Sequence, residues 1–174
     1  MERIFTETVT HTYTRDIELP HDLGVLALIT LDNGDDHKKP TTLGPQSLHN
    51  IQHALHNLRK RAFAGEIAAI GITGKAHVLA AGADLKAATT IATRQDAHDL
   101  GKIGHDTFRI LGELPIPTFC FINGVALGGG LEIALNCTYR TVSSDVQAFS
   151  VAGNVFRSCP RLGWNLLITS TCWP

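Results

Sequence analysis

Two short stretches rich in small residues, each containing one carboxylate, could do chemistry in this chain. The first, residues 120–135, reads Cys-Phe-Ile-Asn-Gly-Val-Ala-Leu-Gly-Gly-Gly-Leu-Glu-Ile-Ala-Leu. Pro117 to Ile122 has the composition of a buried strand. Gly124 and the run Gly128–Gly130 then predict a turn, and an apolar helix follows with Glu132 in its first turn. Because N–H groups at a helix start lack helical partners, such a turn can hold an anion or a developing oxyanion beside the carboxylate.

A tight strand-to-helix turn with a surface glutamate is the alternative interpretation of this stretch. Dinucleotide binding fits poorly, because the glycines at 124 and 128–130 do not have the spacing of the Rossmann fingerprint. No Lys-Ser or Lys-Thr pair follows them, as a phosphate-binding P-loop requires.

The second stretch has the same organisation. Ile67 to Gly74 is typical of a buried strand that ends in glycine, and Ala81-Gly82-Ala83-Asp84-Leu85 leads into another helix. Asp84 is placed as the N-cap or a first-turn acid of that helix. Two strand–glycine–helix units can each aim one N–H group at a single oxygen atom. That arrangement is an oxyanion hole built from backbone rather than side chains.

Together the two stretches resemble the paired motifs of the crotonase superfamily, the enoyl-CoA hydratase/isomerase family. The motifs stand here as Ala80 to Leu85 and Pro117 to Ile133, and the resemblance covers roughly residues 24–149. Pro40 to Leu48 resembles the N-terminal hydratase domain of large fatty-oxidation multifunctional proteins, although the family usually has Asn-Ala-Leu near Thr41-Thr42-Leu43. The resemblance implies an α/β fold: a crotonase-like spiral of ββα units with parallel strands, with the C-terminal helical part missing.

The resemblance also implies a set of site residues. The backbone N–H groups of Ala83 and Gly129 would form the oxyanion hole for a thioester carbonyl, and Glu132 matches the first of two catalytic glutamates. The residues expected along the acyl-CoA are Leu43, Ala81, Asp84 and Leu85. The substrate would be an enoyl-CoA or acyl-CoA, with no further cofactor and no metal. Full-length family members assemble into trimers through C-terminal helices that this chain lacks.

The family's second glutamate lies in a Leu-Pro-Glu motif that is absent here. Residues 150–174 follow neither helical nor strand periodicity, and they contain both tryptophans of the chain. Codons permitted for this segment, read one nucleotide later, can encode the missing motif. We therefore expect a crotonase-like core at residues 1–149, with an N-terminal arm at 1–23, and an out-of-frame tail at 150–174. A divergent but authentic C-terminus is the alternative.

Two functions follow from this interpretation. In the first, the chain is an enoyl-CoA hydratase-type lyase by descent, impaired by loss of the second glutamate. In the second, it is a non-enzymatic truncated fragment with at most weak acyl-CoA binding.

Composition narrows the class of protein. The 174 residues favour one domain, 44% of them are hydrophobic, and the net charge of −1 does not indicate a nucleic-acid or anionic membrane surface. The sequence has no apolar run long enough for a membrane span, and its polar N-terminus is no signal peptide. Cys120 and Cys137 lie in apolar segments and indicate buried free thiols. We therefore expect a cytoplasmic protein.

Periodicity predicts the elements that must position the two glycine turns. Strands are expected at residues 24–31, 67–74, 117–122 and 139–144, with an edge strand or loose arm at 6–18. Helices are expected at 45–62 and 96–114, the first with an apolar stripe made of Leu48, Ile51, Leu55, Leu58 and Ala62. His49, His53 and His56 on this helix have metal-compatible spacing, but a solvated helix flank is the preferred interpretation.

Overall fold

A five-stranded sheet carries most of the core. The computed structural model describes residues 7–36, 39–144, 146, 148–151 and 154–157. The strands of the sheet lie in the order β1-β2-β3-β5-β7: β1 (His11–Glu18), β2 (Val25–Asp32), β3 (Ala69–Gly74), β5 (Thr118–Ile122) and β7 (Tyr139–Val142). The edge strand β1 is antiparallel to β2, and the other neighbours are parallel. The strands expected from periodicity are therefore present, including the edge strand.

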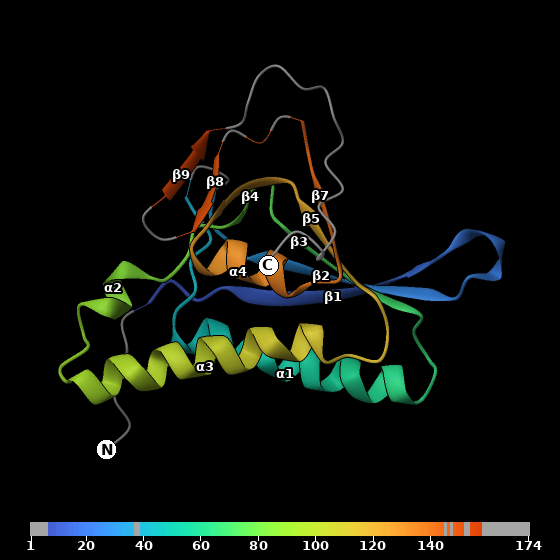
Figure 1. The fold of residues 1–174 in the computed structure, drawn as a ribbon, viewed down its shortest axis with the longest axis horizontal. Helices are drawn as coiled ribbons and strands as arrows, with labels where there is room; N and C mark the ends of the chain where they lie inside the picture. The colour runs from blue at the N-terminus through green and yellow to red at the C-terminus, as the bar shows by residue number, and fades with distance from the viewer. Residues whose placement is uncertain (1–6, 37–38, 145, 147, 152–153, 158–174) are drawn as a thin grey trace.

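A second sheet is built from strands that directly follow those of the first. Its order is β4-β6-β8-β9: β4 (His77–Ala80), β6 (Gly124–Leu127), β8 (Ala148–Val151) and β9 (Asn154–Arg157). Strands β4, β6 and β8 run parallel to one another, and β9 is antiparallel to β8. Each of β3, β5 and β7 passes into a strand of this sheet (Figure 1). The chain thus repeats strand, strand and helix, which confirms the expected spiral of ββα units.

Two long helices cover one face of the larger sheet. They are α1 (Pro45–Phe63) and α3 (Arg94–Gly112), which lie side by side in Figure 1. The shorter helices are α2 (Leu85–Ala88), α4 (Gly129–Asn136) and the 3-10 helix η1 (Pro20–Asp22). Helix α4 contacts α3 and strands of both sheets. The described residues contain no helix after α4.

The core lies between the α1–α3 layer and the sheet. All five members of the α1 stripe are buried, as the periodicity predicted. Alternate residues of β2, β3 and β5 face them, so one side of each strand is closed: Ala27, Ile29, Leu31, Ile70, Ile72, Cys120 and Ile122. Full burial of an aliphatic side chain contributes about 1.5–3 kcal/mol, so this layer is the main source of stability for the fold.

The short strands β4 and β6 are not apparent in the sequence pattern, and the turn expected directly after Gly124 begins instead at Gly128. The side chain of Asn123 explains the difference, because its Nδ2 donates to the carbonyl oxygens of Gly74 (3.0 Å) and Lys75 (2.8 Å). This clamp joins the β5–β6 bend to the β3–β4 bend. A β-carbon built on Gly124 would lie 2.0 Å from the His77 carbonyl oxygen, so only glycine lets β6 approach β4 this closely.

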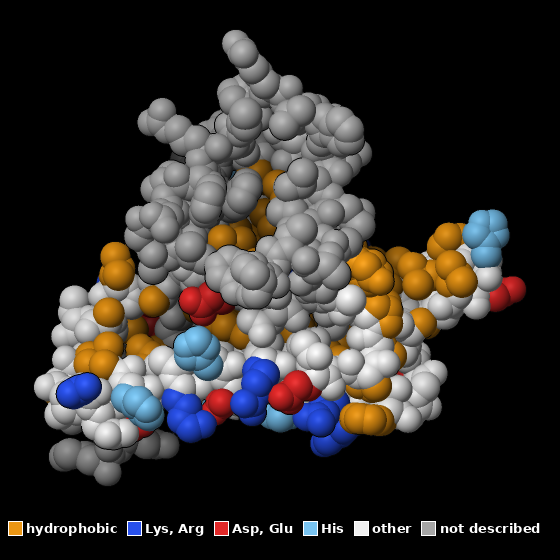
Figure 2. All heavy atoms as spheres, in the orientation of Figure 1, with side chains coloured by type: hydrophobic (Ala, Val, Ile, Leu, Met, Phe, Trp, Pro, Cys, Tyr) orange, Lys and Arg blue, Asp and Glu red, His pale blue; other side chains and the backbone are white. Residues whose placement is uncertain are grey.

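The outer face of α3 is charged with both signs intermixed (Figure 2). Ion pairs one helical turn apart, Lys102–Asp106 and Arg109–Glu113, lie on it. Thr93 and Asp96 form a capping box at the start of α3. No helix in the described part of the chain combines the length and the apolar character that crossing a bilayer requires.

Candidate active site

The two glycine turns follow neighbouring parallel strands and lie against each other. Strands β4 and β6 pair through Ala80 and Ala126, so the residues that follow them leave the same edge of the sheet. A β-carbon built on Gly82 would lie 3.1 Å from the Leu127 carbonyl oxygen. The structure therefore brings together the two turns that the sequence analysis singled out.

Helix α4 starts directly on the end of β4. A β-carbon on Gly130 would lie 2.2 Å from the carbonyl oxygen of Ala80, so the first turn of the helix needs glycine for close approach. A β-carbon on Gly129 would lie 3.1 Å from Leu43 Cδ1 and 3.7 Å from the ring of Phe108. Leu43, which is buried, thus lies beside the helix start.

The N–H groups of Ala83 and Gly129 make no hydrogen bond among the described residues. Leu43 forms a parallel bridge with Ala83 in which its N–H donates to the Gly82 carbonyl oxygen (2.8 Å) and its carbonyl accepts from Asp84 N (3.1 Å). The N–H of Ala83 points away from this bridge. Gly129 is the first residue of α4, where an N–H has no helical acceptor. Two donors are therefore available in adjacent turns.

Glu132 lies on the same face of α4 as Gly129, because residues three apart on a helix are neighbours. Its side chain is half-buried and makes no ion pair or hydrogen bond with another described residue. Its backbone carbonyl accepts a hydrogen bond from Asn136 Nδ2 (2.9 Å), one turn later. Glu132 thus lies one helical turn after Gly129, and its carboxylate has no partner among the described residues.

Asp84 is the N-cap of α2, as the sequence predicted, and it is 5% exposed. Its carboxylate accepts hydrogen bonds from the N–H groups of Thr8, Lys86 and Ala87 and from the Thr42 hydroxyl. Burial acts to raise the pKa of Asp84, but these donors outweigh it and hold the pKa below its usual range. The carboxyl is therefore ionised at neutral pH, and both of its oxygen atoms accept hydrogen bonds from the protein.

The other residues expected along the acyl-CoA are spread around the same turn. Ala81 is half-buried and donates its N–H to the Thr41 carbonyl oxygen (2.7 Å), whereas the side chain of Leu85 is 78% exposed. Contact of Leu43, Ala81, Asp84 or Leu85 with an acyl-CoA stays a prediction.

The sequence analysis expected an N-terminal arm but missed the contacts that its residues 7–10 make with the start of α1. Glu7 accepts hydrogen bonds from the N–H and the hydroxyl of Ser47 at the start of α1, and Thr10 N–H donates to the same hydroxyl (2.9 Å). Burial, with a smaller contribution from the charge of Asp84, raises the pKa of Glu7. No local pattern could have identified these contacts, because they join residues about 40 positions apart.

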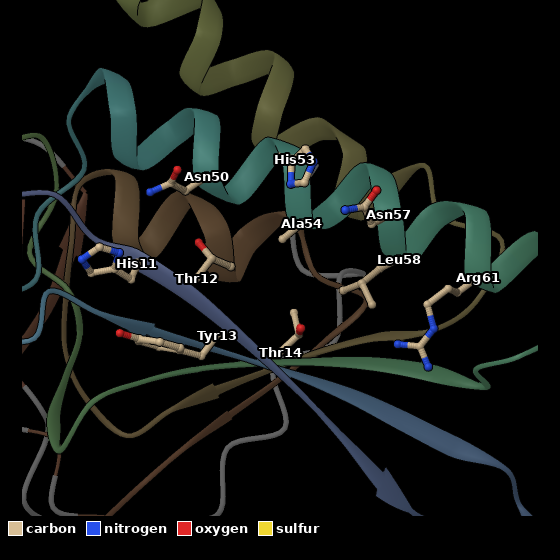
Figure 3. Close-up of a pocket in the computed structure, with 10 residues that line it drawn as sticks. All are labelled: His11, Thr12, Tyr13, Thr14, Asn50, His53, Ala54, Asn57, Leu58 and Arg61. Atoms are coloured by element: carbon tan, nitrogen blue, oxygen red, sulfur yellow. The ribbon is translucent and has the colours of Figure 1, made fainter.

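A groove of about 530 Å³ lies elsewhere, between β1 and α1 (Figure 3). Its walls carry the polar side chains of His11, Tyr13, Asn50, His53 and Arg61, among others. None of the residues predicted for the site lines it. We place the candidate site at the glycine turns, because the unpaired donors and the carboxylate are there and not in the groove.

The chain also carries histidines and cysteines that could bind a metal ion. His49, His53 and His56 lie exposed on α1, and the described residues contain no group of three metal-binding side chains placed to share an ion. Cys120 and Cys137 are buried free thiols, as expected. A hydrogen bond with Cys137, together with burial, raises the pKa of the Cys120 thiol.

The structure describes only some residues of the proposed out-of-frame tail, 150–174. Residues 150–151 and 154–157 belong to β8 and β9, while residues 152–153 and 158–174 lie outside the described residues. The division of the chain at residue 149 therefore stays a prediction.

The sequence and the fold both match known proteins. The family profile described as Enoyl-CoA hydratase/isomerase matches residues 24–168, which includes part of the proposed tail. A fatty acid oxidation complex subunit alpha from Shewanella loihica is 45% identical over 80 residues, which is 46% of this chain and 11% of that protein. Its counterpart from Vibrio parahaemolyticus is 36% identical over 101 residues, 55% of this chain and 14% of that protein.

Solved structures share this fold. An enoyl-CoA hydratase/isomerase from Xanthobacter autotrophicus superposes with a TM-score of 0.65 at 25% identity, covering 80% of this chain and 49% of that one. An enoyl-CoA hydratase from Bacillus anthracis gives a TM-score of 0.65 at 24% identity, covering 80% and 50%. The chain spans about half the length of these structures and about a tenth of the curated relatives. The match of the family profile, over most of a chain with this fold, places the chain in the enoyl-CoA hydratase/isomerase family.

Proposed function

We propose that the two glycine turns bind the thioester carbonyl of an enoyl-CoA and stabilise the enolate formed when water adds to it. The N–H groups of Ala83 and Gly129 would donate to the same oxygen. The observation that carries this proposal is that both donors are unpaired among the described residues and lie in turns that touch. One such donor is worth roughly 3–4 kcal/mol of transition-state stabilisation.

Glu132 would be the base in this reaction. The water oxygen bonds to the β-carbon, the double-bond electrons move toward the carbonyl oxygen, and the water proton passes to the Glu132 carboxylate. The position of Glu132, one turn from Gly129, supports this role. The α-carbon then needs a proton donor, which full family members carry in the Leu-Pro-Glu motif. Because this chain lacks that motif, we expect its hydration of enoyl-CoA to be impaired while carbonyl binding persists.

The substrate class is also part of the proposal. Curated relatives are subunits of fatty acid oxidation complexes, which supports a fatty acyl thioester. The cytoplasmic location remains an expectation from the sequence.

The second candidate function is binding without turnover, as a truncated fragment. Absence of the Leu-Pro-Glu motif favours it. The two candidates differ in whether hydration can be measured, and they share the carbonyl-binding site.

The proposed function can be tested by removing the N–H donor of Gly129 and, separately, the carboxylate of Glu132. Gly129→Pro deletes the N–H at the first helical position, where proline is tolerated, and Arg94→Pro is the matched control at the first position of α3. The probe is cinnamoyl-CoA, a conjugated thioester. When the site polarises its carbonyl group, the absorbance maximum of the bound thioester moves to longer wavelength, which is a red shift. We expect the red shift in the parent chain and in Arg94→Pro, and its loss in Gly129→Pro. A parent chain that does not shift the absorbance would refute the site.

Hydration of crotonyl-CoA then separates the two functions. Glu132→Gln should abolish any hydration while leaving the red shift, and Glu113→Gln, at the exposed end of α3, should change neither. Hydration by the parent chain that depends on Glu132 supports the lyase. A parent chain with a red shift and no hydration supports the binding fragment.

A further inference from the structure

We propose that Asp84 is a positioning residue whose carboxylate ties the N-terminal arm and the loop before α1 to the turn that carries the Ala83 N–H, and so sets the direction of that donor. This inference rests on the proposed function, and it gives Asp84 a role in which it contacts no substrate.

The two oxygen atoms of the Asp84 carboxylate accept hydrogen bonds from different parts of the chain. Oδ1 accepts from the N–H groups of Lys86 (2.8 Å) and Ala87 (3.2 Å), which fixes the start of α2. Oδ2 accepts from the N–H of Thr8 (3.0 Å) and the hydroxyl of Thr42 (3.2 Å), which fixes the arm and the loop. Asp84 follows Ala83 directly, so a shift of this carboxylate moves the Ala83–Asp84 peptide group, and through the Ala83 Cα it also moves the adjoining peptide group that carries the donor.

The arm is itself held firmly. Thr10 donates its hydroxyl to the Thr42 carbonyl oxygen (2.6 Å), and Asn50 Nδ2 of α1 donates to the Thr10 carbonyl oxygen (3.1 Å). With the bond from Thr10 N–H to Ser47, three hydrogen bonds fix residue 10 on α1 and the loop. The tether at Asp84 therefore runs to the long helix of the core and not to a loose end.

The charge of Asp84 is stabilised by these dipoles alone, because it forms no ion pair within the described part of the chain. The charge of Asp84 acts unfavourably on the carboxyl of Glu7 and contributes to its raised pKa. A buried carboxylate without a cation needs all of its donors, so removing any one of them should loosen the whole tether. The Leu43–Ala83 bridge would then be the remaining restraint on the donor.

Two variants test this. Asp84→Asn keeps the shape but replaces one acceptor oxygen with an NH₂ group that faces N–H donors. Thr42→Val removes a single donor with little change of volume. Thr90→Val is the matched control, because the Thr90 hydroxyl donates to the Ala87 carbonyl oxygen and does not reach Asp84.

The measurement is the red shift of bound cinnamoyl-CoA, with its dissociation constant taken in the same titration and the Tm of each variant recorded. We expect Asp84→Asn and Thr42→Val to lose most of the red shift while the dissociation constant changes less than about threefold, and Thr90→Val to match the parent. In an active full-length relative that carries the same contacts, kcat should fall about ten- to a hundredfold with little change in KM, as a small misplacement of a catalytic group does.

Failure of the proposed function and failure of this inference give different results. A parent chain that binds the thioester without a red shift, or does not bind it, would overturn the proposed function and this inference with it. A parent red shift that Thr42→Val and Asp84→Asn both retain would overturn this inference alone. If Asp84→Asn does not fold, the result for Thr42→Val decides.

Discussion

Gly82 and Gly128 lie backbone against backbone, so that a β-carbon built on Gly128 would stand 3.7 Å from the Cα of Gly82. Both have positive φ, +87° for Gly82 and +48° for Gly128. These two glycines join the turn after β4 to the turn after β6, and the distance between the two proposed donors depends on them.

Gly128→Ala adds only one methyl group, but we expect it to disturb the proposed carbonyl-binding site. Alanine rarely adopts φ +48° with ψ −118°, and such a conformation costs about 1–3 kcal/mol. We expect a lower Tm and loss of the cinnamoyl-CoA red shift. Gly101→Ala, on the exposed side of α3 with no atom within 4 Å of the added carbon, should instead raise stability by about 0.5–1 kcal/mol. Equal effects of the two substitutions would contradict this account.

Removal of Arg140 should uncap helix α4. Its guanidinium is buried and donates to the carbonyl oxygens of Ala134, Leu135 and Cys137 at the end of that helix. Arg140→Leu leaves these oxygens without the donor, at a cost of about 2–4 kcal/mol. Thermal unfolding should show a Tm lower by roughly 5–15 °C. Arg15→Gln, at an exposed position of β1, is the control and should stay within about 1–2 °C of the parent.

Glu7 should make stability depend on pH. Its pKa is raised in the folded chain, mainly by burial, so its contribution to stability is fully present below the ordinary glutamate pKa and is lost as pH rises through the folded pKa. Glu7→Gln should therefore raise the Tm at pH 7, by roughly 1–3 °C, and have less effect near pH 4. Asp84 acts in the opposite direction, since its lowered pKa gives stability that is lost as pH falls below about 4.

The control for that pH series is Glu18→Gln, which removes one glutamate charge at an exposed position of β1. A Glu7→Gln variant that is less stable than the parent at pH 7 would mean that the hydrogen bonds of Glu7 to Ser47 outweigh its burial.

The gene should contain a second reading frame near the codon for residue 149. We expect sequencing around the codons for Phe149 and Ser150 to show a reading frame, one nucleotide away, that encodes a Leu-Pro-Glu motif followed by a Pro-Gly-Trp-Gly-Gly motif. Restoring that frame should give a longer, oligomeric protein with enoyl-CoA hydratase activity, measured by crotonyl-CoA absorbance. Absence of such a frame would make residues 150–174 authentic, as the family match to residue 168 allows.

Much of the fold could be predicted because it depends on local periodicity. The stripe from Leu48 to Ala62 has the helical period, and its members are buried as expected. Strand β6 could not be predicted in this way, because four residues carry little pattern and its strand character comes from pairing with β4. Asp84 was predictable as an N-cap from its neighbours, whereas its bonds to Thr8 and Thr42 join residues 76 and 42 positions apart.

The parallel pairing of β4 with β6 has a consequence for the newly made chain. During synthesis from the N-terminus, β4 leaves the ribosome well before β6, and among the described strands β6 is its one neighbour in the second sheet. Until then the apolar residues Val78, Leu79 and Ala80, buried in the finished protein, stand on an open strand edge. Such an edge can pair with other nascent chains. We therefore expect that chaperones acting on the emerging chain, and slow elongation in the interval after β4 has emerged and before β6 does, would change its yield more than they change its final stability.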